Sequence, residues 1–201
     1  MKKAEVYKKL LSIAKVISKT REGGLIIIGP EKKFAKKYDF LYPQLIKKFN
    51  IGEDGIDTLL EKVITLDGAV IISEKGDFLA YGAKIKKTNV VLGFGTKNAA
   101  ASGITTDIKE ATAILISEGI DWIRIYQKGG CVLEMDSSET TKSIKDKIIS
   151  FLTDRDTALV TTAGASAAVL GFAPILLVGG TYLVIKTATG IIKKNIKENN
   201  L

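Results

Sequence analysis

The chain has 201 residues, enough for one domain with a full hydrophobic core and a small addition, but too few for two ordinary domains. Its hydrophobic fraction of 46% and charged fraction of 26% are typical of globular proteins, which excludes a wholly disordered chain. Histidine is absent, which excludes imidazole acid–base chemistry, histidine-ligated zinc and a serine–histidine triad.

The formal net charge of +8 raises the question of a nucleic-acid partner, because lysine and arginine neutralise phosphates. The only arginines are Arg21, Arg124 and Arg155, whereas planar recognition of bases and phosphates favours arginine. We therefore interpret the lysines mainly as a solvated surface, which argues against nucleic acid and leaves attraction to nucleotides or anionic membranes open. The lone Cys131 cannot form an internal disulfide, which fits a core position and a reducing, cytoplasmic compartment.

Hydrophobic periodicity places the elements in chain order. Residues 2–19 carry apolar residues at helical spacing and predict an amphipathic helix, whose apolar stripe we assign to core packing, with contact to anionic lipid as the alternative. Residues 24–29 predict a buried strand, and residues 31–38 and 56–65 predict two helices. Further strands are predicted from apolar runs or alternation at residues 70–73, 78–85, 90–94, 113–117, 122–127 and 131–135.

Turn residues at 74–77 and 128–130 predict that the strands on either side of each turn form antiparallel hairpins. A short helix with a return loop is expected over residues 98–111, and a further helix over residues 138–152. Hairpins combined with crossover helices predict an α/β fold with a mixed central sheet flanked by helices.

Residues 157–185 contain no charged residue and are long enough to cross a bilayer. Their glycines would allow close helix packing in a membrane, and Pro174 suggests a hairpin that returns to the same side. The alternative is a pair of apolar helices packed on the core or on another subunit. We therefore expect an N-terminal helix over 1–24, a core domain over 25–153, an apolar helical segment acting as a membrane anchor or hairpin, and a basic tail over 186–201.

Two segments point to a nucleotide site. Asp67 lies at a strand start and is followed by Gly68, so its carboxylate can hold a divalent metal beside an accessible backbone. Residues 95–101, Gly-Thr-Lys-Asn-Ala-Ala-Ala, provide bare amide groups, a hydroxyl, an ammonium and the positive end of a helix dipole. These are the groups that a polyphosphate requires.

The chain resembles the diadenylate cyclase family, defined by the DisA N-terminal or DAC domain. The resemblance rests on residues 66–72 (Leu-Asp-Gly-Ala-Val-Ile-Ile), on Gly82 and Ala83, on residues 95–105, and on residues 114–118, which follow the family's order. It implies an enzyme that condenses two ATP molecules into cyclic di-AMP and pyrophosphate. Each subunit of a homodimer would hold one ATP.

The resemblance also implies roles for individual residues. Asp67 would bind Mg²⁺ or Mn²⁺, Glu118 would assist the metal, and Lys97 would complete the catalytic set by contacting phosphates. The implied nucleotide-binding residues are Gly68, Ala69, Gly82, Ala83, Gly95, Thr96, Lys97, Asn98 and Ser117.

One motif departs from the family pattern. Where the family has Arg-His-Arg, this chain has Lys97, Asn98 and Ala99, so it keeps one cation and loses the imidazole and the second guanidinium. The alternative function is therefore a degenerate member that binds adenine nucleotide or cyclic di-AMP as a sensor.

Overall fold

The computed structural model describes residues 1–90, 95–136, 142–153, 175–178 and 181–184. The helices are α1 (Lys3–Lys19), α2 (Ile56–Ile64), α3 (Thr96–Asp107) and α4 (Lys142–Thr153), with a 3-10 helix at Glu31–Phe34. The strands are β1 (Gly24–Gly29), β2 (Tyr38–Phe40), β3 (Ala69–Ser73), β4 (Phe78–Ile85), β5 (Thr112–Ile116), β6 (Trp122–Gln127), β7 (Gly130–Asp136), β8 (Ile175–Val178) and β9 (Thr181–Val184).

One sheet joins the described strands in the order β2-β4-β3-β1-β5-β6-β7-β8-β9. β1 pairs in parallel with β3, and β7 pairs in parallel with β8, whereas the other neighbours are antiparallel. The turns predicted at residues 74–77 and 128–130 join β3 to β4 and β6 to β7 as antiparallel hairpins. The sheet is therefore mixed, as the sequence predicted.

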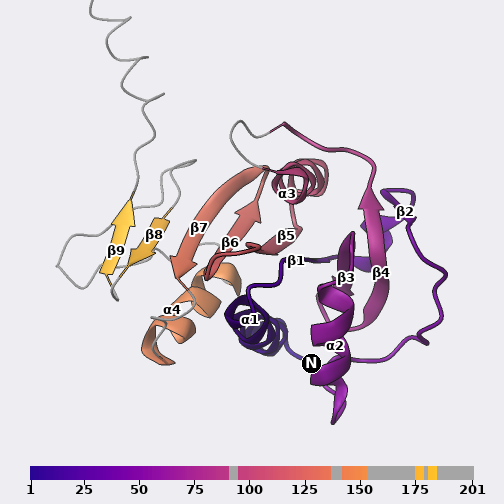
Figure 1. The fold of residues 1–201 in the computed structure, drawn as a ribbon, viewed down its shortest axis with the longest axis horizontal. Coiled ribbons are helices and arrows are strands. Elements are labelled where there is room, and N and C mark those ends of the chain that lie inside the picture. Colours follow the sequence, from indigo (N-terminus) through magenta and orange to yellow (C-terminus); the bar gives the residue numbers. More distant parts are fainter. Residues whose placement is uncertain (91–94, 137–141, 154–174, 179–180, 185–201) are drawn as a thin grey trace, which may run out of the picture.

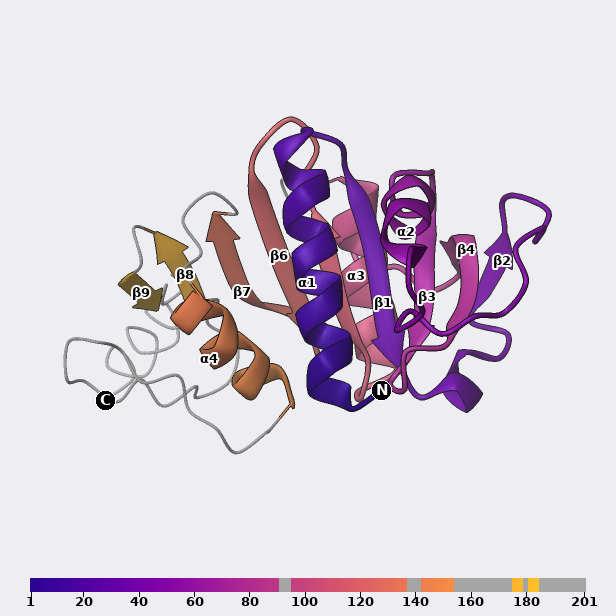
Figure 2. The same cartoon turned by 90° about the horizontal axis from the view of Figure 1, so that it is seen from below.

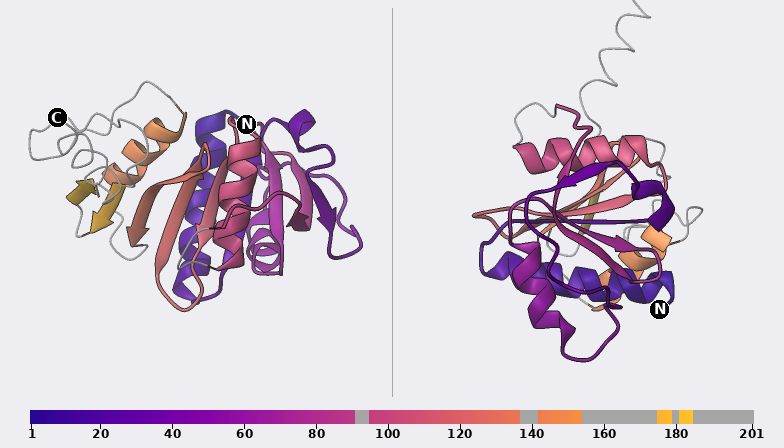
Figure 3. Two further views of the ribbon diagram at one scale, coloured as in Figure 1. Left: turned by 90° about the horizontal axis from the view of Figure 1, so that it is seen from above. Right: turned by 90° about the vertical axis from the view of Figure 1, so that its right-hand side faces the viewer.

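Helices cover both faces of the sheet. Figure 3 shows α3 on one face and α1, α2 and α4 on the other, and Figure 2 shows α1 running along the middle of the sheet. In β1, Ile26 and Ile28 join the buried cluster on the α1 side, while Leu25 and Ile27 join the cluster on the α3 side. Because both faces of β1 are covered, its sequence is a continuous apolar run and does not alternate with polar residues.

The apolar stripe of α1 belongs to this core. Val6, Leu10, Ile13 and Ile17 are buried, and burial of one such large side chain contributes roughly 1.5–3 kcal/mol. The stripe therefore packs on the sheet and leaves the lysines of α1 facing outward, which confirms core packing as its role.

Residues 31–38 form less helix than expected. Only the 3-10 helix Glu31–Phe34 forms, and Lys36 then adopts a φ of 61°, a left-handed conformation that cannot continue a right-handed helix. β2 follows and pairs with β4. Of the strand predicted at residues 90–94, Val90 lies outside any strand, and residues 91–94 lie outside the described part of the chain.

The apolar C-terminal run also differs from its predicted helical form. Residues 175–178 and 181–184 form β8 and β9, so the expectation of a helix is corrected for these residues. Both segments are rich in β-branched and other large apolar residues, and pairing with the edge of β7 supplies the backbone hydrogen bonds of a strand. The rest of residues 157–185 and the tail 186–201 lie outside the described residues. In the part of the chain that the structure describes, no helix combines the length and the apolar character needed to span a membrane.

Candidate functional site

The ends of three central strands bring several candidate residues to one end of the sheet. β1 and β3 both start at this end because they are parallel, and β5 finishes there because it is antiparallel to β1. Gly24, the first residue of β1, pairs with Ile116, the last residue of β5. Asp67 lies two residues before Ala69, where β3 begins, and Ser117 and Glu118 directly follow β5. These three residues therefore lie on the two sides of the start of β1.

The N-terminus of α3 reaches the same end of the sheet. α3 runs along the strands from Thr96 to Asp107, and the chain then enters β5 at the opposite end of the sheet (Figure 3). Because β5 finishes beside the start of β1, the first turn of α3 lies near that start. The positive end of the α3 dipole is therefore close to Ser117 and Glu118.

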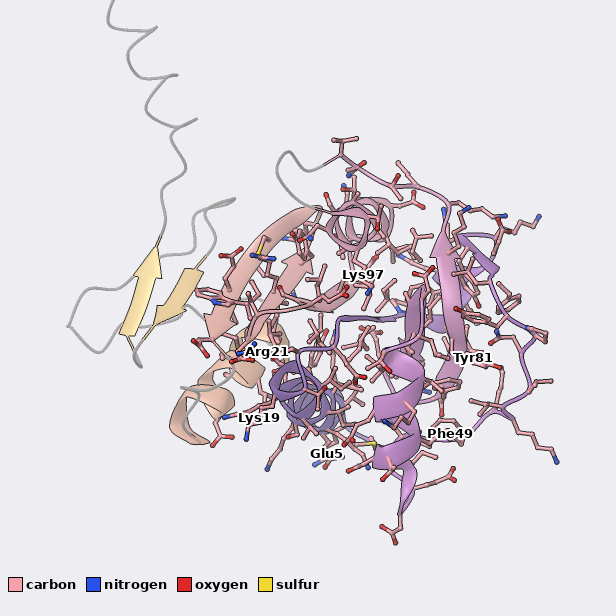
Figure 4. The ribbon with its side chains drawn as sticks, viewed as in Figure 1. Glu5, Lys19, Arg21, Phe49, Tyr81 and Lys97 are labelled. Carbon is pink, nitrogen blue, oxygen red and sulfur yellow. The ribbon has the colours of Figure 1, made fainter. Side chains whose placement is uncertain are left out.

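Lys97 extends from the first turn of α3 toward β1 (Figure 4). A Cβ atom built on Gly23 would lie 3.1 Å from Lys97 Nζ and 3.1 Å from Glu118 Cβ. The Lys97 ammonium forms no ion pair with any carboxylate of the described residues, so its charge is available to an anionic ligand. Gly23, which was not among the predicted site residues, lies between these two side chains. Its only sequence signal is a pair of glycines before a buried strand.

Asp67 and its neighbours occupy a place where two strands approach closely. Asp67 is exposed, and its Oδ1 accepts a hydrogen bond of 2.9 Å from the backbone amide of Gly68. Gly68 has a φ of 89°, and a Cβ atom added there would lie 2.6 Å from the carbonyl carbon of Gly82. Ala69 pairs with Ala83, so Gly68 and Ala69 lie beside Gly82 and Ala83 of β4. Close approach of the strands is itself a reason for glycine at position 68.

The side chain of Tyr42 packs against Gly82 on this edge of the site, and a Cβ atom on Gly82 would collide with its ring. Tyr42 is not identifiable as a site residue from the sequence, since a single tyrosine in a loop carries no pattern. The ring fills the space that the missing Gly82 side chain leaves, so it contributes an aromatic surface next to Gly68.

The residues of the 95–98 turn take different positions. Gly95 and Thr96 are exposed, whereas Asn98 is buried and its Oδ1 accepts a hydrogen bond of 2.7 Å from the Tyr126 hydroxyl. Burial raises the pKa of the Tyr126 hydroxyl, which keeps its proton in place as the donor. The Asn98 side chain therefore ties the first turn of α3 to β6, while Thr96 keeps its hydroxyl at the surface.

Ser117 has a charged partner that sequence reasoning did not identify. Arg124 Nη1 donates a hydrogen bond of 3.2 Å to Ser117 Oγ, and Arg124 Nε lies 2.7 Å from Glu134 Oε1. The side chains of Arg124 and Glu134 are 15% and 19% exposed. Because the three residues come from β6, the end of β5 and β7, only the strand register brings them together.

The acidic residues at this end of the sheet suit a magnesium or manganese ion only together with a substrate. No group of three or more acidic or cysteine side chains that could hold a metal occurs in the described residues. Mg²⁺ is commonly held by one or two carboxylates and by substrate phosphates, and Asp67 and Glu118 are the acidic candidates on the two sides of β1. Both are exposed, and the second oxygen of Asp67 has no hydrogen bond within the described chain.

A cavity of about 360 Å³ lies away from these residues, at the β2 edge of the sheet. Phe34, Tyr38, Phe40 and Leu79 form its apolar lining, and no candidate site residue contributes to it. The candidate site is instead a surface at the sheet end, because Asp67 and other polar residues there are exposed.

Comparison with known proteins identifies the family. The family model described as DisA bacterial checkpoint controller nucleotide-binding, or DAC, matches residues 12–131, which is more than half of the chain. A diadenylate cyclase from Haloferax volcanii is 28% identical over 120 residues, which cover 57% of this chain and 44% of that protein. The chain therefore matches less than half the length of this relative.

Among solved structures, DacA from Staphylococcus aureus shares the fold. The two structures superpose with a TM-score of 0.53 at 18% sequence identity, over 75% of this chain and 96% of that one. The mixed sheet flanked by helices is therefore the DacA-like fold. The family match over residues 12–131 and this shared fold lead to one conclusion: the chain belongs to the DAC family, the DisA bacterial checkpoint controller nucleotide-binding domains.

Proposed function

We propose that the chain is a metal-dependent diadenylate cyclase, which condenses two ATP molecules into cyclic di-AMP and releases two pyrophosphates. The observation that carries this proposal is the gathering of Asp67, Lys97, Ser117 and Glu118 at the end of the sheet where α3 begins. Membership of a nucleotide-binding family and the similarity to a diadenylate cyclase support the same reading.

In this proposal the triphosphate of ATP lies at the N-terminus of α3. In the first turn of α3 the Asn98 amide already donates to the Gly95 carbonyl, whereas the amides of Thr96 and Lys97 precede the first bond of this kind and, with the Thr96 hydroxyl, are suited to phosphate oxygens. The Lys97 ammonium of α3 adds a positive charge, and the Ser117 hydroxyl adds a hydrogen-bond donor from the end of β5. Asp67 and Glu118 would hold Mg²⁺ or Mn²⁺, which when bound neutralises the departing pyrophosphate.

The reaction needs mainly positioning. The 3′-oxygen of one ATP forms a bond to the α-phosphorus of the other, the bond between the α-phosphorus and the bridging oxygen breaks, and the 3′-hydroxyl loses its proton. The same step in the opposite direction closes the ring. Fixed donors such as Lys97 and Ser117 stabilise charge that develops on the phosphate oxygens.

Two ATP molecules must face each other, so the proposed activity requires a homodimer. Leu66 and Ile120 are 38% and 48% exposed, and each lies next to or close to one of the acidic site residues in the sequence. Exposed apolar side chains beside a polar site are suited to contact with a second copy of the chain. Sedimentation of the protein with and without ATP would test this arrangement.

A second function follows from the Lys-Asn-Ala departure. Asn98 is buried against Tyr126, and Ala99 carries no charge, so Lys97 is the motif's single cation. A site with one cation binds a polyphosphate but neutralises less of the charge that develops during transfer. The alternative is therefore a sensor that binds adenine nucleotide or cyclic di-AMP without making it.

The decisive experiment incubates the purified chain with ATP and Mn²⁺ or Mg²⁺ and identifies the products by chromatography and mass spectrometry. We expect cyclic di-AMP from the parent and a loss of at least about 100-fold in rate for Asp67→Asn, which removes a charged metal ligand. Asp57→Asn is the matched control, because Asp57 pairs with Lys9 at 2.7 Å on the α1 and α2 side of the sheet. Bound ATP without product would favour the sensor.

Membrane association through the apolar segment 157–185, with a cytoplasmic nucleotide domain, is a separate proposal, and because residues 175–178 and 181–184 are strands of the sheet it now concerns residues 157–174. It rests on the uncharged sequence of this segment. Fractionation of cells followed by carbonate washing of the membranes tests it, and recovery of the full chain in the supernatant would contradict it.

A further inference from the structure

A half-buried guanidinium lies beside the hydroxyl that we assign to the phosphates of ATP. Arg124 pairs with Leu115 on β5 and with Glu134 on β7, so its side chain is on the same face of the sheet as theirs. Leu115 belongs to the buried cluster under α3. Arg124 is therefore on the sheet face that α3 covers, which is also the face from which Lys97 reaches Gly23.

The hydrogen bonds fix the direction in which Ser117 can act. Arginine has donors only, so in the contact with Arg124 the Ser117 oxygen is the acceptor. The hydroxyl proton of Ser117 then remains for another acceptor, and among the described residues none accepts it. Ser117 is only 7% exposed and directly follows β5, at the same end of the sheet as the other candidate residues.

Glu134 holds the guanidinium in place. The contact of 2.7 Å between Arg124 Nε and Glu134 Oε1 fixes one edge of the planar group, which leaves Nη1 aimed at Ser117. Because Glu134 balances the charge of Arg124, the pair acts less by long-range attraction than by orientation. A lysine at position 124 could contact Ser117 or Glu134, but its single ammonium does not reproduce the rigid fork.

We propose that Arg124, held by Glu134, is a positioning residue that orients the Ser117 hydroxyl as a donor to a phosphate oxygen of bound ATP. It thereby supplies a guanidinium at a site whose Lys97, Asn98 and Ala99 motif has none. This inference rests on the proposed function, because it takes the ligand to be a nucleoside triphosphate.

A double-mutant cycle on nucleotide binding tests the inference. The dissociation constants of ATP with Mg²⁺ and of adenosine are measured for the parent, Arg124→Lys, Ser117→Ala and the double variant. We expect Arg124→Lys to weaken ATP binding about tenfold, the scale of one hydrogen bond to a charged group, and to leave adenosine binding unchanged. In the Ser117→Ala background the same substitution should have almost no further effect, because the hydroxyl that Arg124 orients is gone.

Lys33→Gln is the control for the loss of an ion pair, since Lys33 pairs with Glu110 at 2.6 Å near the opposite end of α3. It should leave ATP binding unchanged. Glu134→Gln should reproduce the effect of Arg124→Lys if Glu134 holds the guanidinium. Thermal unfolding of each variant identifies any that has lost its fold, and Arg124→Lys keeps the charge to limit that risk.

Two results would overturn the inference: equal weakening of ATP and adenosine binding by Arg124→Lys, or the same tenfold loss with Ser117 absent. Failure of the proposed catalysis is a distinct result. A parent that binds ATP but forms no cyclic di-AMP refutes the cyclase while the binding cycle still decides the role of Arg124. A parent that binds no ATP refutes both.

Discussion

Gly68 provides a direct test of the close approach between β3 and β4. Its φ of 89° is a conformation in which a residue with a side chain is strained by about 1–2 kcal/mol. An added Cβ atom would also lie 2.6 Å from the carbonyl carbon of Gly82, 2.8 Å from its Cα and 2.9 Å from the backbone nitrogen of Ala83. All three atoms belong to the backbone, so no side chain can rotate away, and overpacking of this kind costs about 1–3 kcal/mol more.

We therefore expect Gly68→Ala to lower the free energy of unfolding by about 2–5 kcal/mol, the sum of the conformational and steric costs. Gly55→Ala is the matched control, because Gly55 has a φ of 77° but a Cβ atom there meets nothing within 4 Å. The control should lose only the conformational part, about 1–2 kcal/mol.

Urea unfolding followed by the fluorescence of Trp122, the only tryptophan, measures both variants. With a denaturant slope of about 1–3 kcal/mol per molar urea, the steric difference shifts the midpoint of Gly68→Ala by roughly 1 M beyond that of the control. Equal midpoints for the two variants would refute the close contact between Gly68 and Gly82.

Two further predictions concern titratable groups. Burial, reinforced by the charge of Glu134, raises the pKa of the Cys131 thiol to about 12. At about pH 8 the thiolate fraction, and hence the rate of alkylation by iodoacetamide, should be roughly 1000-fold below that of an unstructured cysteine peptide. Equal alkylation rates for the folded protein and the peptide would contradict this prediction. Hydrogen bonds from Asn50 and Ser73 lower the pKa of the Asp77 carboxyl. The ionised carboxylate therefore stabilises the fold at pH values above the pKa of about 3.9 that Asp77 has in the unfolded chain. This stabilisation is lost as the pH falls through the lower pKa that Asp77 has in the folded protein. Asp77→Asn should therefore destabilise the protein at about pH 6, by less than about 1 kcal/mol because the group is partly exposed, and by a smaller amount at about pH 3. Urea unfolding at both pH values measures this destabilisation. A destabilisation that is the same at both pH values would show that the Asp77 carboxylate is not responsible.

Local patterns were sufficient for most elements. The spacing of Leu10 and Ile17 identified the buried face of α1, and the apolar run before Gly29 identified a strand covered on both sides. Such patterns work because helices and strands repeat their side-chain directions with fixed periods. They failed for residues 175–178 and 181–184, since a short apolar run fits a strand as well as a helix, and pairing with β7 decided between them.

The candidate site was predictable in its residue types but not in its supporting contacts. Asp67 and Lys97 stood out because a carboxylate beside glycine and a Gly-Thr-Lys turn carry local chemical signals. The sequence predicts Asn98 as a nucleotide contact but not its hydrogen bond from Tyr126, and it gives no signal for Arg124. The partners of these two side chains lie on other strands or helices, and no spacing along the chain reports them.

The amino-acid sequence by itself determined the family, the mixed α/β character and the absence of histidine chemistry, because motif order, periodicity and composition are properties of the chain alone. Only the tertiary structure decided that Gly23 separates Lys97 from Glu118 and that Arg124 joins Ser117 to Glu134. The physical reason is that strand register and the placement of α3 bring together residues that are far apart along the chain. Their contacts arise when the apolar faces of β1, β5 and α3 are buried together, and a local sequence pattern does not specify which polar groups then meet at the edge.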